Sequence, residues 1–127
     1  MAKWSFSMIN REEYAKVLEA SKALGFNNYQ KEAHSTAVYP PEMGMAYCVT
    51  GLCAECGEVA DKVAKYYRGD GDLNRDGLKK ELGDVLWFIA ELSTHLGFDL
   101  DEVAQGNLDK LADRQKRNAL KGNGDNR

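Results

Sequence analysis

Two long apolar repeats with the period of an α-helix limit what this chain can fold into. The helical spacing runs over about residues 42–68 and returns over about 76–96, with the loop RGDGDLNRDG between them. Only two prolines occur, adjacent at Pro40–Pro41, so neither segment is interrupted. The positions that follow the period are Val49, Leu52, Cys53, Cys56, Val59 and Val63 in the first segment and Leu78, Leu82, Val85, Leu86, Ile89, Leu92 and Leu96 in the second.

Shorter helices are expected before this pair. Asn10 and Glu13 have the spacing of a capping box, which predicts a helix that stops near Gly25. A second short helix is expected within residues 27–39, ending before the prolines because the residue that precedes a proline disfavours helical geometry.

A last long helix is predicted over about 99–117, opened by Asp99 and Glu102 in another capping-box spacing. Its expected apolar face comprises Val103, Ala104, Leu108 and Leu111. No segment shows a convincing strand pattern or an internal repeat. The sequence therefore predicts an all-α, antiparallel helical bundle with a four-helix-like core and an extra N-terminal helix.

Composition and charge exclude several classes of function. The net charge of −3 and the lack of a basic face make nucleic acid an unexpected partner. The N-terminal stretch has no long apolar region of the signal-peptide kind, and no apolar run is long enough to cross a membrane. We therefore expect a cytoplasmic protein without a membrane partner.

The three cysteines, Cys48, Cys53 and Cys56, do not indicate a disulfide framework because their number is odd. Cys53 and Cys56 form a CxxC, but no second CxxC or histidine pair completes a zinc site. We expect small, buried thiols instead.

Two pairs of acids stand at matching positions on the two long helices. We draw a helical wheel for each helix, with Leu52 at zero in the first and Leu78 at zero in the second. Glu55 and Glu81 then both fall at about 300°, and Glu58 and Asp84 both fall at about 240°. A short loop joins the helices, so they should pack antiparallel, with the acidic edges of their apolar stripes facing each other. The offsets predict that the four carboxylates converge.

Four converging carboxylates repel one another and require a cation. Oxygen-only ligands suit Mg²⁺, with Mn²⁺ as a second possibility, and Mg²⁺ commonly binds together with substrate phosphates. The competing interpretation is a solvated acidic helix surface. A di-iron site is disfavoured because neither pair has the Glu-x-x-His form that such bundles use.

In these motifs the sequence resembles the MazG-like, all-α nucleoside triphosphate pyrophosphohydrolases. The family signature, ExxE followed by ExxD, is present as Glu55-Cys-Gly-Glu58 and Glu81-Leu-Gly-Asp84. The blocks GLCAECGEVADKV, KKELGDVLWFIAEL, NLDKLADR and KGNGDNR match in order, over residues 27–127. Residues 1–26 fall outside the pattern as an N-terminal helical extension, and the cysteines of the first block occupy places where the family tends to have Ala or Gly.

The resemblance implies hydrolysis of a (deoxy)nucleoside triphosphate to the monophosphate and pyrophosphate. Glu55, Glu58, Glu81 and Asp84 would be the catalytic, Mg²⁺-binding residues, and we assign Glu58 as the base for the attacking water because it lies farther from the apolar stripe. A phosphoribosyl-ATP pyrophosphohydrolase is an alternative with the same signature. A non-catalytic, nucleotide-binding helical interaction protein is an alternative of another class.

Further substrate-binding residues are expected near these pairs. Lys62 lies between the two acids on the wheel, where it can pair with a carboxylate, contact phosphate or simply remain a surface lysine. Phe88 follows Asp84 by one turn and is expected either to stack on a base or to pack in the core.

The C-terminal region carries the expected phosphate contacts. Asn107, Lys110 and Arg114 fall within about 40° of one another on the last helix, and by resemblance this stretch helps to bind the phosphates. Lys121 and Arg127 in the glycine-rich tail are also candidates, with a frayed end as the alternative.

Three aromatic residues have less specific expectations. Tyr29 and His34 are candidates to line a base pocket, although a structural role is favoured for both, and Trp87 is expected at a helix or subunit interface. Because a few helices leave apolar flanks unburied, a homodimer or homotetramer should complete the core. The resemblance also implies sites between subunits.

Overall fold

The computed structural model describes residues 12, 13, 15, 16 and 24–126. Every regular element within 24–126 is helical, which confirms the all-α class. In chain order these are α2 (Phe26–His34), a short 3-10 turn η1 (Pro41–Met43), α3 (Gly44–Arg68), α4 (Arg75–Leu96) and α5 (Leu100–Lys116). The helix expected from the Asn10 and Glu13 capping box falls mostly outside the described residues.

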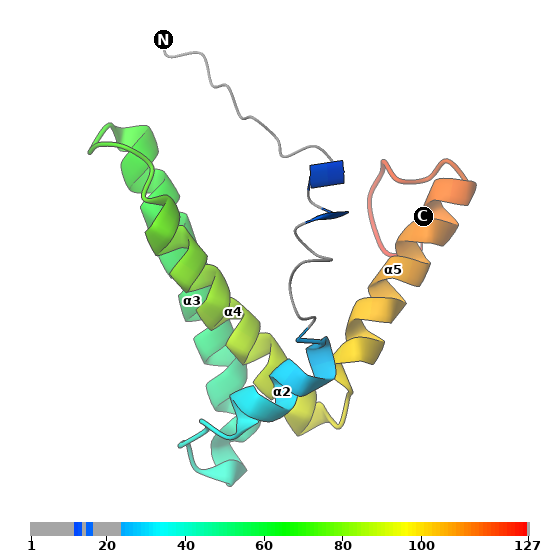
Figure 1. Ribbon diagram of the computed structural model, residues 1–127, viewed down its shortest axis with the longest axis horizontal. Helices are drawn as coiled ribbons and strands as arrows, with labels where there is room; N and C mark the ends of the chain where they lie inside the picture. Colours follow the sequence, from blue (N-terminus) through cyan, green and yellow to red (C-terminus); the bar gives the residue numbers. More distant parts are fainter. Residues whose placement is uncertain (1–11, 14, 17–23, 127) are drawn as a thin grey trace.

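Helices α3 and α4 form a long antiparallel hairpin, which is one arm of the molecule (Figure 1). Helix α3 ends at Gly69, which adopts a left-handed backbone with φ 89°, a conformation that glycine reaches without steric cost. Helix α4 begins at Asn74, whose side chain accepts a hydrogen bond of 2.8 Å from the amide of Gly77. These two end signals fix a tight connection, and the tight connection forces the two helices to pack against each other.

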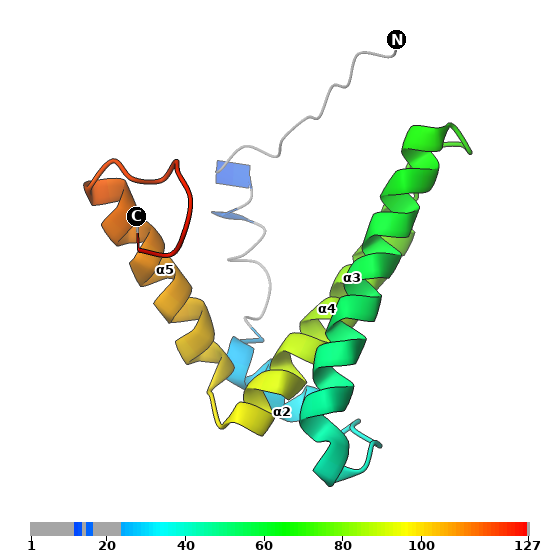
Figure 2. The same cartoon turned by 180° about the vertical axis from the view of Figure 1, so that it is seen from behind.

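Helix α2 crosses the base of the hairpin and contacts both α4 and α5, as both views show (Figures 1 and 2). The buried cluster at this crossing consists of Ala33, Ala90 and Leu100, one residue from each helix. Tyr29, Trp87 and Ile89 pack around it. Trp87 also donates a hydrogen bond of 2.9 Å from its indole nitrogen to Thr36 Oγ1, so its expected place at a helix interface is confirmed.

Helix α2 is shorter than the segment 27–39 that the sequence suggested. It ends at His34 because the hydroxyls of Ser35 and Thr36 bond back to the carbonyls of Glu32 and Ala33, at 2.6 and 2.7 Å. Such side-chain bonds compete with helix propagation. The chain then runs without regular structure to the proline pair, and this run carries Tyr39 toward α4.

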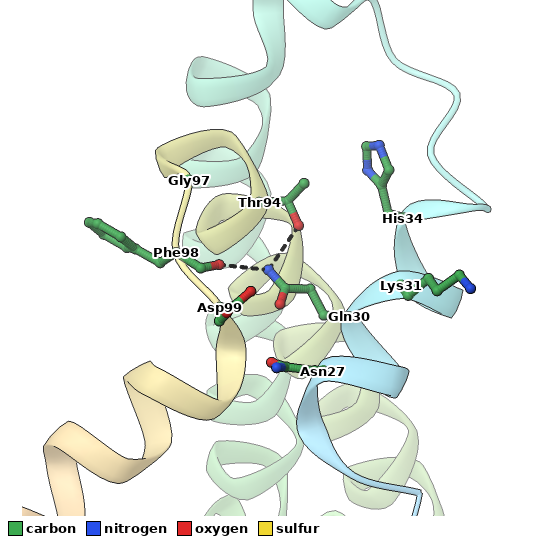
Figure 3. A pocket seen from close by; sticks show the side chains of 8 residues that line it. All are labelled: Asn27, Gln30, Lys31, His34, Thr94, Gly97, Phe98 and Asp99. Atoms are coloured by element: carbon green, nitrogen blue, oxygen red, sulfur yellow. Dashed lines mark hydrogen bonds between the residues drawn. The ribbon is translucent and has the colours of Figure 1, made fainter.

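The start of α5 is capped by side chains of α2 rather than by its own Asp99. The amide of Leu100 donates to Gln30 Oε1 at 2.8 Å and that of Asp101 donates to Asn27 Oδ1 at 2.9 Å. The side-chain Nε2 of Gln30 in turn donates to Thr94 Oγ1 and to the backbone carbonyl of Phe98, at 3.1 and 2.9 Å (Figure 3). Asp99 makes no side-chain cap, so this part of the capping-box expectation is wrong. Helix α2 thus satisfies the first N–H groups of α5 and sets the direction in which α5 leaves.

Helix α5 diverges from the hairpin and forms the second arm of a V (Figures 1 and 2). Its predicted core face is exposed in the chain: Val103 is 42% exposed, Leu108 57% and Leu111 39%. On the hairpin, Val49 and Leu82 of the predicted stripes are also exposed. The helical period therefore located apolar faces that one chain leaves partly exposed, as expected for helices of this number and length.

Gln30 provides a test of how α5 is held. Replacing Gln30 with Ala removes two donated bonds and one accepted bond at the α4–α5 turn, so we expect the free energy of unfolding to fall by about 1–3 kcal/mol in urea denaturation. Gln105→Ala is the matched control, since the exposed Gln105 bonds only to Asp109 of its own helix. Equal stabilities of the two variants would show that α5 is held by other contacts.

Candidate active site

Three carboxylates of the two ExxE and ExxD motifs converge on the hairpin. Glu55 of α3 and Glu81 and Asp84 of α4 each place one oxygen so that all three lie within 4.8 Å of one another. Glu81 and Asp84 share a face because they are three residues apart on one helix. Glu55 meets them because α3 packs antiparallel along that face.

Glu58, the fourth acid, lies one turn from Glu55 but is exposed and stands outside this group of three. With Lys62 it lines a polar pocket of about 330 Å³ that extends toward the α3–α4 loop. Glu58 therefore faces water beside the cluster.

Repulsion and burial shape the electrostatics of the cluster. Burial, followed by the negative charges of Asp84 and Glu81, raises the pKa of Glu55 above the usual carboxyl range. Lys62 partly compensates: its ammonium lies 2.5 Å from Glu81, and that hydrogen bond raises the pKa of Lys62. This pairing is one of the roles expected for Lys62. One lysine against the three acids and the nearby Glu58 leaves a net negative site, which fits a divalent cation held by oxygen ligands.

An aromatic pocket, lined mainly by residues of α3 and by Phe88 of α4, lies near the cluster. Phe88 is buried and packs on Gly51, where a Cβ atom would lie only 2.2 Å from the Phe88 ring. Phe88 and Tyr47, with ring centroids 5.6 Å apart, line a mainly apolar pocket of about 470 Å³. Since Gly51 precedes Glu55 by four residues and Phe88 follows Asp84 by four, the pocket begins about one helical turn from the acids.

The cationic stripe of α5 lies apart from the acids. Among the described residues α5 contacts α2 and α4 but not α3, because it belongs to the other arm of the V. Lys110 and the buried Arg114 both approach Asp125 of the tail, at 3.5 and 3.3 Å. Arg114 also donates to the backbone carbonyls of Gly124 and Asp125, so its guanidinium holds the tail against α5.

The remaining predicted site residues are exposed or outside the described part. Asn107 and Lys121 are exposed, and Arg127 is not among the described residues. Tyr29 packs against the core at the α2 crossing, where burial and then the charge of Asp84 raise the pKa of its hydroxyl.

The expectation of three buried thiols is wrong for two of them. Cys48 is buried, whereas Cys53 and Cys56 are exposed free thiols. Because both are exposed on α3, they are not the small residues that allow close packing. Gly51, beneath the Phe88 ring, has that role.

Sequence reasoning missed a buried polar group on α4. Glu91 is fully buried and bonds to Tyr39 and His34, and Tyr39 also contacts His95. A signal was present, because Glu91 interrupts an apolar run and lies, with His95, on the same strip of α4 as Asp84, about 220° to 260° on the wheel.

Comparisons with known proteins place the chain in a family. The protein is all-helical, and both helices of its hairpin contribute acids to one group of oxygen ligands that suits a divalent cation. The chain belongs to the MazG nucleotide pyrophosphohydrolase domain family, whose model matches residues 45–118. It is 44% identical over 109 residues to the Gene 37 protein of Mycobacterium phage L5, an alignment that covers 78% of this chain and 96% of that protein. No solved structure matches the chain. Over the described residues, no helix is long and apolar enough to cross a membrane.

The raised pKa of Glu55 makes a prediction about the metal-free protein. A carboxyl whose pKa is higher in the folded than in the unfolded state holds its proton longer when folded, so stability falls as pH rises through that window, starting near about pH 4.5. Glu55→Gln removes this loss, and we expect it to raise the melting temperature in EDTA at pH 8 by a few degrees.

The same variant should lose the stabilisation that Mg²⁺ gives to the wild type, because one ligand is gone. Differential scanning fluorimetry with EDTA and with Mg²⁺ reads both effects. Glu32→Gln on the exposed face of α2 is the control and should change neither. A lower melting temperature for Glu55→Gln in EDTA would contradict the repulsion argument.

Proposed function

We propose that this chain hydrolyses a (deoxy)nucleoside triphosphate to the nucleoside monophosphate and pyrophosphate. The observation that carries the proposal is the group of three carboxylates on antiparallel helices, in a chain of the MazG family. Glu55, Glu81 and Asp84 would hold Mg²⁺, with Mn²⁺ as a substitute. Bound there, a divalent cation supplies Lewis-acid chemistry: it withdraws charge from phosphate oxygens and increases the acidity of water.

Glu58 is the proposed general base. It lies one turn from Glu55, it is exposed, and it does not belong to the group of three, so its carboxylate is available to a water molecule. In the reaction Glu58 accepts the proton of the water that attacks the α-phosphorus, and pyrophosphate leaves. Lys62, beside Glu81, is placed to balance charge on the departing phosphates.

The aromatic pocket is the proposed site of the base. The pocket begins about one helical turn from the acids, and an apolar, aromatic wall suits the face of a nucleobase. In this arrangement Phe88 and Tyr47 contact the base while the triphosphate extends toward Glu55 and Asp84.

We propose that a second copy of the chain supplies the phosphate-binding residues of α5 and of the tail. Asn107, Lys110 and Lys121 are remote from the acids of their own chain, and Arg114 supports the tail that lies beside Lys110. The exposed leucines of α5 and the exposed apolar residues of the hairpin form surfaces that a partner subunit would bury. A homodimer or homotetramer in which α5 of one copy approaches the hairpin of another answers both needs.

The activity is tested with a panel of NTPs and dNTPs in the presence of Mg²⁺, with detection of monophosphate and pyrophosphate. We expect turnover of at least one nucleotide, and a loss of about 10²- to 10⁴-fold in kcat for Glu58→Gln, the range associated with a general base. Asp61→Asn is the control, since Asp61 is an exposed neighbour that pairs with Lys65.

The alternatives have distinct outcomes when phosphoribosyl-ATP is added to the panel. Exclusive turnover of phosphoribosyl-ATP would identify the other pyrophosphohydrolase class. Nucleotide binding without turnover, and a Glu58→Gln variant equal to wild type, would leave a non-catalytic binding protein.

The oligomer is tested on α5. Replacing both Leu108 and Leu111 with Glu puts charge on the exposed apolar face, and we expect sedimentation velocity to show a monomer where the wild type is a dimer or tetramer. Activity should fall with the dissociation. The pair Glu102→Gln and Asp109→Asn changes polar, exposed positions of the same helix and is the control. A wild-type monomer that is fully active would refute the shared site.

A further inference from the structure

Among the described residues, Glu91 is the one acidic side chain that is buried, with 0% of its surface exposed. It is not part of the acidic cluster, and the proposed reaction gives it no role. A carboxylate taken out of water is tolerated only when donors surround it. Its partners therefore indicate what it holds in place.

Three side chains form a chain of donors that points at Glu91. His34 Nδ1 lies 3.2 Å from Oε2, and the hydroxyl of Tyr39 donates a short hydrogen bond to the same oxygen. His95 Nε2 lies 2.6 Å from the Tyr39 oxygen. Since the single Tyr39 proton is directed to the carboxylate, the His95 ring must donate from Nε2 to the tyrosine oxygen. Burial and the bond to Glu91 also raise the pKa of Tyr39 far above its usual range, so the hydroxyl stays protonated.

The Tyr39 ring connects this anchor to the aromatic pocket. It stacks on Tyr47 with ring centroids 4.6 Å apart, and Tyr47 contacts Phe88. Tyr47 is 44% exposed, so it is only partly enclosed by its neighbours. Fixing the Tyr39 hydroxyl at one point therefore limits where the ring of Tyr47 can rest.

We propose that Glu91 and Tyr39 are positioning residues for the nucleoside, which orient the Tyr47 wall of the pocket. The inference rests on the proposed function, in which this pocket takes the base. Apolar residues in place of the whole group of Glu91, Tyr39 and His34 could fill the space at little cost in stability, as complete buried ion pairs often can be replaced. A hydroxyl–carboxylate bond instead selects a single ring orientation, and orientation of the bound substrate is what a reaction at the α-phosphorus requires.

The test is Tyr39→Phe, which removes one hydroxyl and keeps the ring. We expect KM for the preferred nucleoside triphosphate to rise about tenfold, the effect of one hydrogen bond to a charged group, with kcat within about twofold of wild type. Binding of inorganic tripolyphosphate, which lacks a base, should not change in isothermal titration calorimetry. Thr94→Val, which breaks the Gln30 bond at the same α2–α4 interface, is the control and should leave both values unchanged.

A double-mutant cycle with Tyr47→Ala separates positioning from general damage. If Tyr39 acts through Tyr47, Tyr39→Phe has no further effect in the Tyr47→Ala background. Additive effects, or a parallel loss of tripolyphosphate binding, would overturn the proposal. Should the wild type hydrolyse no nucleotide, the proposed function fails, and the cycle is then measured on nucleotide binding, where the same coupling supports the positioning role and its absence refutes it.

Discussion

The packing of α3 against α4 is the interaction on which the rest of this molecule depends. It holds the oxygens of Glu55, Glu81 and Asp84 within 4.8 Å of one another although their charges oppose that arrangement. The hairpin sustains the repulsion because its helices are long and its connection is tight, with Gly69 ending one helix and Asn74 starting the other. The hairpin itself thus brings the acids together, which is the arrangement that electrostatic preorganisation requires.

How much of this could be read from the sequence differs from element to element. The helical period located α3 and α4 within a few residues, and the matched angular offsets anticipated that acids of the two helices would meet. A wheel gives the angle of a side chain from its own apolar stripe, but not the rotation that packing imposes on the whole helix. This is why Asp84 joins the cluster while Glu58, at the same offset on α3, lies outside it.

Features that depend on distant side chains were beyond the sequence. The direction of α5 follows from Gln30 and Asn27, about seventy positions earlier in the chain, which cap its first amides. The early end of α2 follows from local hydroxyls, and the burial of Glu91 follows from a tyrosine that only this early end allows to reach α4. The direction of α5 and the burial of Glu91 are tertiary effects, whereas the end of α2 is set by local side-chain bonds.

One strip of α4 joins these parts into a single functional surface. Along this strip the acids Glu81 and Asp84 come first and the aromatic Phe88 follows. The buried Glu91 comes last, bonded to its histidine and tyrosine partners. The order matches a nucleotide laid along the groove, with phosphates at the charged end and the base at the aromatic end. Because Glu81, Asp84, Phe88 and Glu91 project from one continuous helix, the helical rise fixes their spacing, and a change in the rotation of α4 would move the proposed phosphate site and the proposed base site together. Positioning of the aromatic wall by Glu91 and of the acids by α3 are therefore two constraints on the same rigid element.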